Sequence, residues 1–291
     1  MKLDFDKFIV KPGSKVNLKD YDTGFTAGLK KKNGVKELQH NIEELALLQE
    51  KFWADNRYSM LIILQAPDAA GKDGAIRHVM SGLNPQSCRV HSYKAPSREE
   101  HDHDYLWRHY KDLPERGMIE IFNRSHYENV LATKVNPGYL MSENIPGIDS
   151  PDKADKKFWN ERYEQINNFE KHIHQNGTRI VKIFLHLSKE EQKERLLARL
   201  NEKEKNWKFS SDDLKSRAQW DEYQSAYEDM MEKTSTDYAP WYVVPADKKF
   251  FARVAIGEII VENLKKLELQ YPAGESTEQL LKAKEILMSE K

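Results

Sequence analysis

The chain has 291 residues, and its 46 lysine and arginine residues nearly balance 47 aspartate and glutamate residues, so that the formal net charge is -1. This balance argues against a protein that coats nucleic acid, because such a protein needs a basic excess, and we expect no nucleic-acid partner. Cys88 is the only cysteine, which excludes an internal disulfide and a cysteine-rich zinc site and indicates a reducing compartment.

The hydrophobic pattern shows no membrane-targeting segment. Residues 1–6 lack the apolar core of a signal peptide, and no uninterrupted apolar run reaches the ~18 residues of a membrane span. We therefore expect a cytoplasmic protein without a membrane partner. A chain of this length can bury a sizeable apolar core, either as one large domain or as a core with additions.

Three regions are expected along the chain. Residues 1–34 are polar, carry several lysines and glycines, and are predicted to form an arm over the core. Apolar residues at helical spacing predict a helix over 35–56, which opens a main domain placed at 35–270. The last segment, 271–291, is predicted to be a separate amphipathic helix, better suited to an interface or a surface than to catalysis.

Strand-like and helical patterns alternate through the main domain. Strands are predicted at 59–65, 88–93, 118–123, 179–187 and 241–244, and further helices at 72–82, 98–110, 155–176, 189–204, 212–233 and 249–269. This alternation indicates an α/β fold with a parallel sheet covered on both faces. Since ligands of such sheets bind beyond the carboxyl ends of the strands, the residues that follow each strand are the first candidates for a site.

The first strand runs into a phosphate-binding pattern. The sequence Leu-Ile-Ile-Leu-Gln-Ala-Pro-Asp-Ala-Ala-Gly-Lys-Asp-Gly occupies positions 61–74. Small residues allow backbone N–H groups to surround phosphate oxygens, the following helix contributes positive charge at its start, and the lysine reaches the terminal phosphates. The residues predicted to bind phosphate here are Ala69, Ala70, Gly71, Lys72, Asp73 and Gly74.

This pattern departs from the usual phosphate-binding loop at two positions. Ala66 stands in place of the first glycine, and Asp73 replaces the serine or threonine that normally contacts magnesium. Asp68 is the candidate replacement ligand, because carboxylate oxygens suit Mg²⁺. An ordinary strand–turn–helix junction that contains Gly-Lys remains the alternative.

A second group of candidates follows the strand at 118–123. Arg124 is predicted to grip phosphate bidentately in the same crevice, whereas the alternative is a surface arginine at a strand end. Asn123 occupies the place of a metal-orienting aspartate, or else it closes a turn. Glu128 lies four residues after Arg124 and could orient its guanidinium or a metal-bound water, or could form an exposed salt pair.

The stretch 189–212 combines many charges of both signs on a helical pattern. Arg195 and Arg199 are one turn apart, so they are candidates to reach phosphates from a helical lid that excludes water on closure. A solvated mixed-charge face is the alternative. Trp207 is the one tryptophan considered for stacking on a base.

With these segments in place, the chain resembles polyphosphate kinase family 2, whose members are P-loop kinases that move phosphoryl groups between inorganic polyphosphate and nucleotides. The resemblance extends over roughly 35–265, and the segments that carry it are 66–74, Leu106-Trp107-Arg108, 122–128 and 235–247. It implies a three-layer α/β/α fold, a helical lid at about 189–212, dependence on Mg²⁺ and assembly into a homo-oligomer, a dimer or a tetramer.

The resemblance also implies roles for single residues. Asp68 and Lys72 would serve metal and phosphate, and Asn123 with Arg124 would fill a second motif in which many members have Asp-Arg. Asparagine at this position, together with Glu128, resembles the subgroup that accepts both nucleoside monophosphates and diphosphates. Ala66, where many members have glycine, is a mild departure.

These observations support one hypothesis and two alternatives. The hypothesis is a reversible, magnesium-dependent kinase that phosphorylates AMP and ADP with inorganic polyphosphate, with guanine nucleotides as further candidate acceptors. Its predicted catalytic residues are Asp68, Lys72, Asn123, Arg124 and Glu128. The alternatives are an ATP-dependent nucleoside or nucleotide kinase on the same scaffold and a non-catalytic nucleotide-binding protein whose site has decayed.

Overall fold

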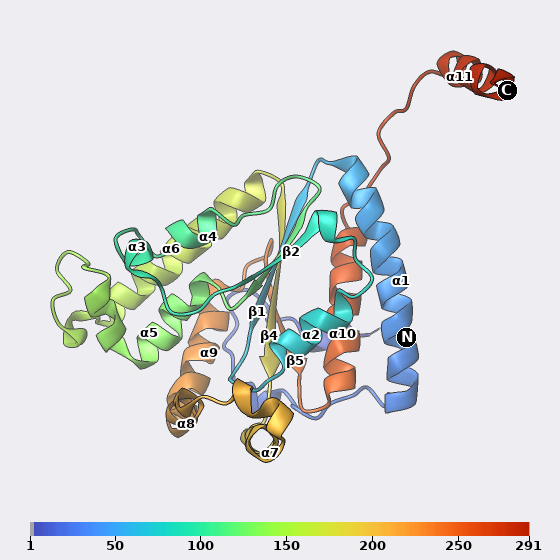
Figure 1. Cartoon of the computed structure of the whole chain (residues 1–291). Coiled ribbons are helices and arrows are strands. Elements are labelled where there is room, and N and C mark those ends of the chain that lie inside the picture. The colour runs from blue at the N-terminus through green and yellow to red at the C-terminus, as the bar shows by residue number, and fades with distance from the viewer. Residues whose placement is uncertain (1–2, 291) are drawn as a thin grey trace.

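The computed structural model describes residues 3–290 and has a five-stranded sheet at its centre (Figure 1). All strand pairs in the sheet are parallel, and the strand order is β2-β3-β1-β4-β5. The strands are β1 (Ser59–Gln65), β2 (Cys88–Ser92), β3 (Ile119–Asn123), β4 (Thr178–His186) and β5 (Trp241–Pro245). The five predicted strands and their parallel arrangement are therefore confirmed, with ends that differ by one residue at most.

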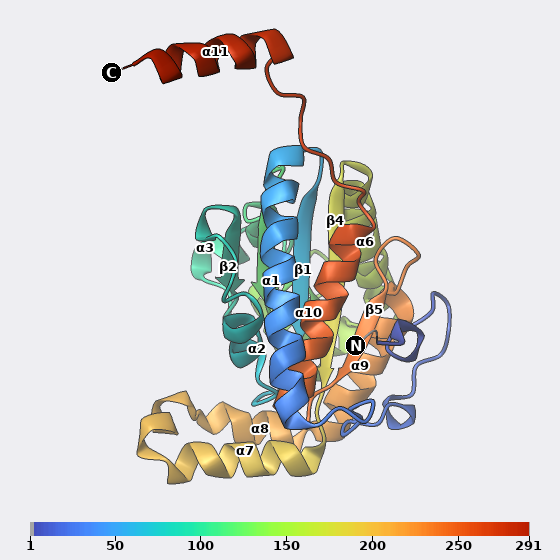
Figure 2. The same cartoon turned by 90° about the vertical axis from the view of Figure 1, so that its right-hand side faces the viewer.

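Helices cover both faces of this sheet. One face carries α1 (Lys31–Asp55), α2 (Lys72–Val79) and α10 (Lys249–Lys265), and Figure 2 shows α1 and α10 side by side. The other face carries α6 (Lys156–Gln175) and α9 (Trp220–Thr234), with the short α5 (Ala132–Val135) nearby. The three-layer α/β/α prediction is confirmed.

The central strand β1 supplies side chains to both layers. Met60, Ile62 and Leu64 belong to the apolar core beneath α1 and α10, whereas Leu61 and Ile63 belong to the core beneath α6 and α9. Every residue of β1 is buried, because the strand has neighbours on both edges and helices on both faces. This double burial is the reason that its sequence is continuously apolar from Met60 to Leu64.

Two predicted helices are broken in the structure. The 98–110 segment forms only α3 (Arg98–His101) and α4 (Trp107–Tyr110), because Asp104 accepts a hydrogen bond from the backbone N–H of Leu106 at 2.9 Å and holds a turn between them. The 212–233 segment forms α8 (Ser211–Ala218) and α9. The break falls at Gln219, whose side chain bonds Asn136 at 3.0 Å.

The carboxyl ends of the strands lie at one edge of the sheet, where α7 (Lys189–Asn201) and α8 pack in both views (Figures 1 and 2). Residues 3–30 run beside β5, where the N–H of Val10 bonds the carbonyl of Trp241 at 2.9 Å. The last helix, α11 (Thr277–Ser289), has no buried residue and stands apart from the rest in both figures. Within residues 3–290, no helix has the length and apolar character to cross a bilayer.

Candidate active site

The loop between β1 and α2 has the backbone shape of an anion-binding turn. Ala69 and Gly71 have positive φ angles of 62° and 100°, and Gly71 is the N-cap of α2. A φ of 100° is strained for any residue with a side chain, which explains glycine at this position. The first backbone N–H groups of α2 have no partner inside the helix, so they are available to phosphate oxygens.

Lys72 is the first residue of α2 and turns back toward this loop. Its ammonium group donates a hydrogen bond to the carbonyl oxygen of Ala66 at 3.1 Å. Burial, followed by the nearby charge of Arg124, lowers the pKa of Lys72 to about 8, against the opposing effect of Asp68 and Glu128. The electrostatic influence of all three neighbours shows that the two predicted motifs meet at one site.

Arg124 joins the two motifs directly. Its backbone has a φ of 64°, in the left-handed region, and its N–H donates to the carbonyl of Leu64 on β1 at 3.1 Å. Its guanidinium lies 2.7 Å from an Asp68 carboxylate oxygen and 3.6 Å from a Glu128 carboxylate oxygen. Glu128, followed by Asp68, raises the pKa of Arg124, so the guanidinium stays charged.

Asn123 ends β3 and contacts the opposite side of the loop. Its amide nitrogen donates to a carboxylate oxygen of Asp73 at 2.8 Å and lies 3.4 Å from the hydroxyl of Ser92. Because β3 pairs with β1, the register places Asn123 beside Leu64, one strand from the phosphate-binding loop. The neutral amide links β2, β3 and the start of α2 without adding charge.

The five predicted catalytic residues thus form one charged cluster, although their catalytic roles stay predictions. Two cations, Lys72 and Arg124, face the carboxylates of Asp68, Asp73 and Glu128. Phosphate oxygens are chemically suited to replace these carboxylates as partners of the two cations. The arrangement favours transfer between strongly anionic substrates over chemistry at a neutral centre.

Arg195 and Arg199, the two arginines predicted to reach phosphate from the lid, bond to other groups of the protein and not to the charged cluster. The guanidinium of Arg195 donates to the backbone carbonyls of Ala69 and Ala70 in the phosphate-binding loop. Arg199 bonds Asp213 at 2.9 Å and the carbonyl of Lys208 at 3.1 Å, which joins α7 to α8. In this arrangement protein oxygens occupy the donors of Arg195, and its contact with polyphosphate stays a prediction. Trp207 is 78% exposed.

A basic cluster beside the loop was missed by sequence reasoning. Arg253 lies 3.8 Å from the point where a side chain on Gly74 would begin. Burial, followed by the charge of Arg77, lowers the pKa of Arg253. Burial, followed by the charges of Arg195 and Arg253, lowers the pKa of Lys249, so these cations are close neighbours. Within residues 3–290, the side chains of Arg77, Lys249 and Arg253 form no hydrogen bond or ion pair. The available signal was the Lys249 and Arg253 pair at helical spacing, which is common on solvated helices.

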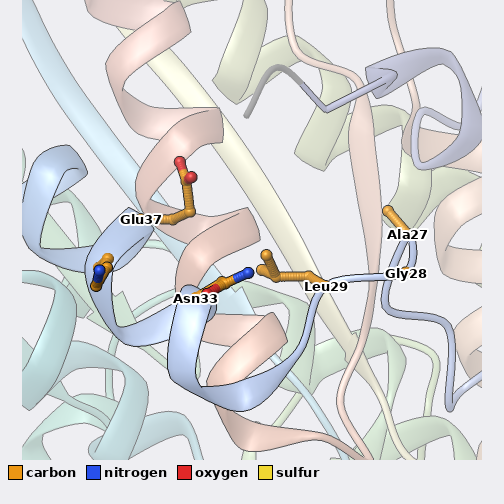
Figure 3. Close-up of a pocket in the computed structure, with 6 residues that line it drawn as sticks. Ala27, Gly28, Leu29, Asn33 and Glu37 are labelled. Carbon is orange, nitrogen blue, oxygen red and sulfur yellow. The ribbon is translucent and has the colours of Figure 1, made fainter.

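A surface pocket of about 340 Å³ lies elsewhere, at the start of α1. In Figure 3, Ala27 and Gly28 border it from the N-terminal arm, while Asn33 and Glu37 border it from the first turns of α1. None of the predicted site residues lines this pocket, and we assign it no role.

Taken with the fold, this constellation defines a P-loop kinase. Comparison with known proteins gives the particular family: the family described as Polyphosphate kinase 2 (PPK2) matches residues 28–272. The chain belongs to the polyphosphate kinase 2 family.

Individual members of known function or structure are similar to this chain over nearly its whole length. The ADP-polyphosphate phosphotransferase of Rhodopseudomonas palustris is 50% identical over 94% of this chain and 93% of its own length. The AMP/ADP-polyphosphate phosphotransferase of Meiothermus ruber is 40% identical over 94% of this chain and 97% of its own length. The crystal structure of polyphosphate kinase 2 from Arthrobacter aurescens TC1 superposes with a TM-score of 0.85 at 40% identity, covering 94% of both chains.

Proposed function

We propose that this chain transfers phosphoryl groups from inorganic polyphosphate to AMP and ADP, reversibly and with Mg²⁺, and that guanine nucleotides are further acceptors. The observation that carries the proposal is that Lys72 and Arg124 meet beyond two neighbouring strands, where Arg124 pairs with Asp68 and Glu128 and the same two carboxylates act electrostatically on Lys72. The relatives named above, whose printed names specify polyphosphate and ADP or AMP/ADP, support the substrate class.

In this reaction the side chains position and neutralise rather than attack. An acceptor phosphate oxygen is already ionised, so no protein nucleophile is required. Lys72 and Arg124 would hold the transferred phosphoryl group between donor and acceptor and offset the charge that develops in the transition state. Glu128 would keep the guanidinium of Arg124 oriented, and the backbone N–H groups at the start of α2 would bind the adjoining phosphate.

Magnesium fits this site as a substrate-bound ion. Among residues 3–290, no group of three or more histidine, cysteine or acidic side chains is arranged to hold a metal. Mg²⁺, however, usually keeps several waters and binds through one or two carboxylates together with substrate phosphates. Asp68 suits this role, because Arg124 occupies one carboxylate oxygen and no residue of 3–290 hydrogen-bonds to the other. When bound, the ion would offset phosphate charge.

The donor chain would extend from Gly74 along the basic cluster of Arg77, Lys249 and Arg253. A flexible polyanion is attracted by neighbouring cations, and Arg253 lies close to the charges of both Arg77 and Lys249, so an anion that binds there would relieve their repulsion. This path replaces the one predicted through Arg195 and Arg199.

For Arg253→Ala we expect KM for long-chain polyphosphate to rise about fivefold with little change in kcat, because a contact to donor phosphates other than the transferred one contributes uniform binding. With tripolyphosphate, which can contact fewer cations of the basic cluster, the same variant should show a smaller rise in KM. Steady-state kinetics with both donors measure the difference. Arg57→Ala is the matched control, since Arg57 is 52% exposed and pairs with Asp55 at 2.7 Å. Equal losses with both donors would contradict the proposed path.

The pKa of Lys72, about 8, predicts a fall in activity on the alkaline side. Below this pH the ammonium group is charged and binds phosphate, whereas above it the free enzyme loses the proton and must regain one to bind the donor. We expect kcat/KM for polyphosphate to fall about fivefold between pH 8 and 9 as this single group deprotonates. In Lys72→Arg the residual activity should show no such fall, because guanidinium stays protonated. Identical profiles for both enzymes would assign the titration to another group.

Phosphorus NMR of the purified protein with polyphosphate, Mg²⁺ and AMP, without ATP, tests the proposed function. New β and γ phosphate signals are expected as ADP and ATP form. Signals that appear only after ATP is supplied would instead indicate an ATP-dependent kinase, and no turnover with any donor would indicate a binding protein. Parallel reactions that start from ADP test whether the enzyme accepts both AMP and ADP, as the combination of Asn123 and Glu128 predicts.

We further propose that the chain acts as a homo-oligomer, a dimer or a tetramer. Its α11 exposes a set of apolar side chains: Leu280, Leu281, Ile286, Leu287 and Met288. An isolated helix of 13 residues is marginal in water, so contact with another copy would stabilise it. Sedimentation of the full chain measures the state of assembly.

A further inference from the structure

Arg195 occupies an unusual place for an arginine on a charged helix. It lies in α7, a helix with a largely exposed surface, yet its own side chain is only 7% exposed. Burial of a guanidinium is costly unless its donors are satisfied, so its partners indicate why it is buried.

Protein oxygens satisfy every donor of this guanidinium. Its Nε donates to Glu191 at 2.8 Å, one turn earlier on α7. Its Nη1 donates to the backbone carbonyls of Ala69 at 3.3 Å and Ala70 at 2.6 Å, and its Nη2 donates to those of Ala246 at 2.6 Å and Asp247 at 3.2 Å. An arginine side chain has five N–H donors, so none is left for a phosphate.

These bonds determine which way the phosphate-binding loop presents its N–H groups. The peptide bonds of residues 3–290 are all trans, so a carbonyl and the next N–H point in opposite directions. Since Arg195 holds the Ala70 carbonyl, the Gly71 N–H points away from α7, and no group of residues 3–290 accepts a hydrogen bond from it. The Ala70 N–H, in contrast, donates to Pro67 within the loop at 3.3 Å.

The same guanidinium joins three segments that are distant in sequence. Ala69 and Ala70 follow β1, Ala246 and Asp247 follow β5, and Arg195 itself follows β4. Gln192, one turn earlier on α7, adds a bond from its amide nitrogen to the carbonyl of Asp68 at 3.1 Å. Side chains of α7 therefore bond to backbone carbonyls of the phosphate-binding loop, on the side opposite to the Gly71 N–H.

From this geometry we infer that Arg195 is a positioning residue for phosphoryl transfer: it holds the backbone of the phosphate-binding loop so that the Gly71 N–H faces the substrate phosphate, and it does not bind polyphosphate. The kinetic test of this inference rests on the proposed function, whereas the test by hydrogen exchange of the loop does not. It assigns to the guanidinium fork a task that a lysine cannot perform, because an ammonium group carries three donors and cannot span two pairs of carbonyls.

The test compares Arg195→Lys with Arg195→Ala. We expect Arg195→Lys to lower kcat about 10- to 100-fold, the range that a misplaced reactive group produces, while KM for polyphosphate changes less than about twofold. Arg195→Ala should resemble the lysine variant, and added ethylguanidinium should restore part of its rate. Hydrogen exchange of residues 66–74 should be faster in both variants.

Arg179→Lys serves as the control. Arg179 bonds Asn263 at 2.9 and 2.6 Å at the start of β4, the edge of the sheet opposite to the site, so its loss should affect stability without changing kcat or exchange in the loop. A lysine variant with near-normal kcat and an intact exchange pattern would overturn the inference, as would a raised KM with unchanged kcat, which indicates a simple charge contact. If the unmodified protein shows no transfer, the proposed function fails, and loop exchange in Arg195→Lys against Arg179→Lys still decides the positioning role.

Discussion

Replacing Lys72 with methionine is expected to lower kcat/KM for polyphosphate-dependent ADP formation about a thousandfold. Among the described residues, Lys72 is the only lysine of the charged cluster. Removing one electrostatic contact to a transition state lowers kcat by a factor of about 100 to 1,000. Methionine retains a flexible stem of similar length. Steady-state kinetics with AMP and polyphosphate measure the loss.

The fold should tolerate the Lys72→Met change. The variant loses one hydrogen bond, to Ala66, which contributes about 1 kcal/mol, but it also removes a charge that burial disfavours. Its free energy of unfolding should therefore stay within about 1 kcal/mol of the unmodified value. Lys157→Met is the matched control, because the Lys157 side chain is 83% exposed and its ion pair with Glu161 is at the surface. A folded Lys72→Met enzyme with near-normal rates would remove Lys72 from the mechanism.

Replacing Arg124 is expected to have an effect of similar size. Arg124→Ala should lower kcat/KM about a thousandfold, because Asp68 and Glu128 contact the guanidinium and would hold it against the transferred phosphoryl group. Arg124→Lys keeps the charge but loses the planar fork, so a loss of about a hundredfold is expected. Equal rates for the lysine variant and the unmodified enzyme would show that charge alone is sufficient.

The backbone at Arg124 allows a separate check on folding. Its φ of 64° costs an ordinary residue about 1–2 kcal/mol, whereas glycine adopts this conformation freely. Arg124→Gly should therefore be more stable than Arg124→Ala by about 1 kcal/mol, measured by denaturant unfolding, although both are expected to be equally inactive. If the two variants differ in activity, the loss reflects loop geometry rather than the missing guanidinium.

Much of the fold could be predicted because its signals are local. A strand such as β1 is buried on both faces, so a continuous apolar run identifies it without knowledge of its neighbours. Gly71 and Lys72 mark the loop, because the left-handed backbone and the phosphate contact each require a particular residue type at a fixed distance along the chain.

The errors arose where side chains compete with local periodicity. The 98–110 segment has helical spacing, but Asp104 bonds a backbone N–H two residues ahead and holds a turn instead. Gln219 likewise leaves the helical conformation between α8 and α9, with its amide bonded to Asn136, a residue far away in sequence. Helical periodicity reports which face is apolar and carries no information about such partners.

The roles of arginines were the hardest to assign, because a long side chain reaches several partners from one backbone position. Arg195 and Arg199 share a helical spacing, yet Arg195 turns inward to carbonyls of two loops and Arg199 turns to Asp213. Arg77 and Arg253, which look like ordinary helix surface residues in sequence, lie close together beside Gly74.

Residue types and short-range spacing were therefore sufficient for the strands, the phosphate-binding loop and the family resemblance, since each depends on contacts within a few residues or on burial of one face. The strand order, which sets β3 beside β1 and so brings Arg124 to Asp68, required the folded chain. The folded chain was also required to show that Arg195 bonds to the carbonyls of Ala69 and Ala70 in the phosphate-binding loop. Both are decided by packing between segments more than fifty residues apart, where the chain's local preferences no longer determine which groups meet.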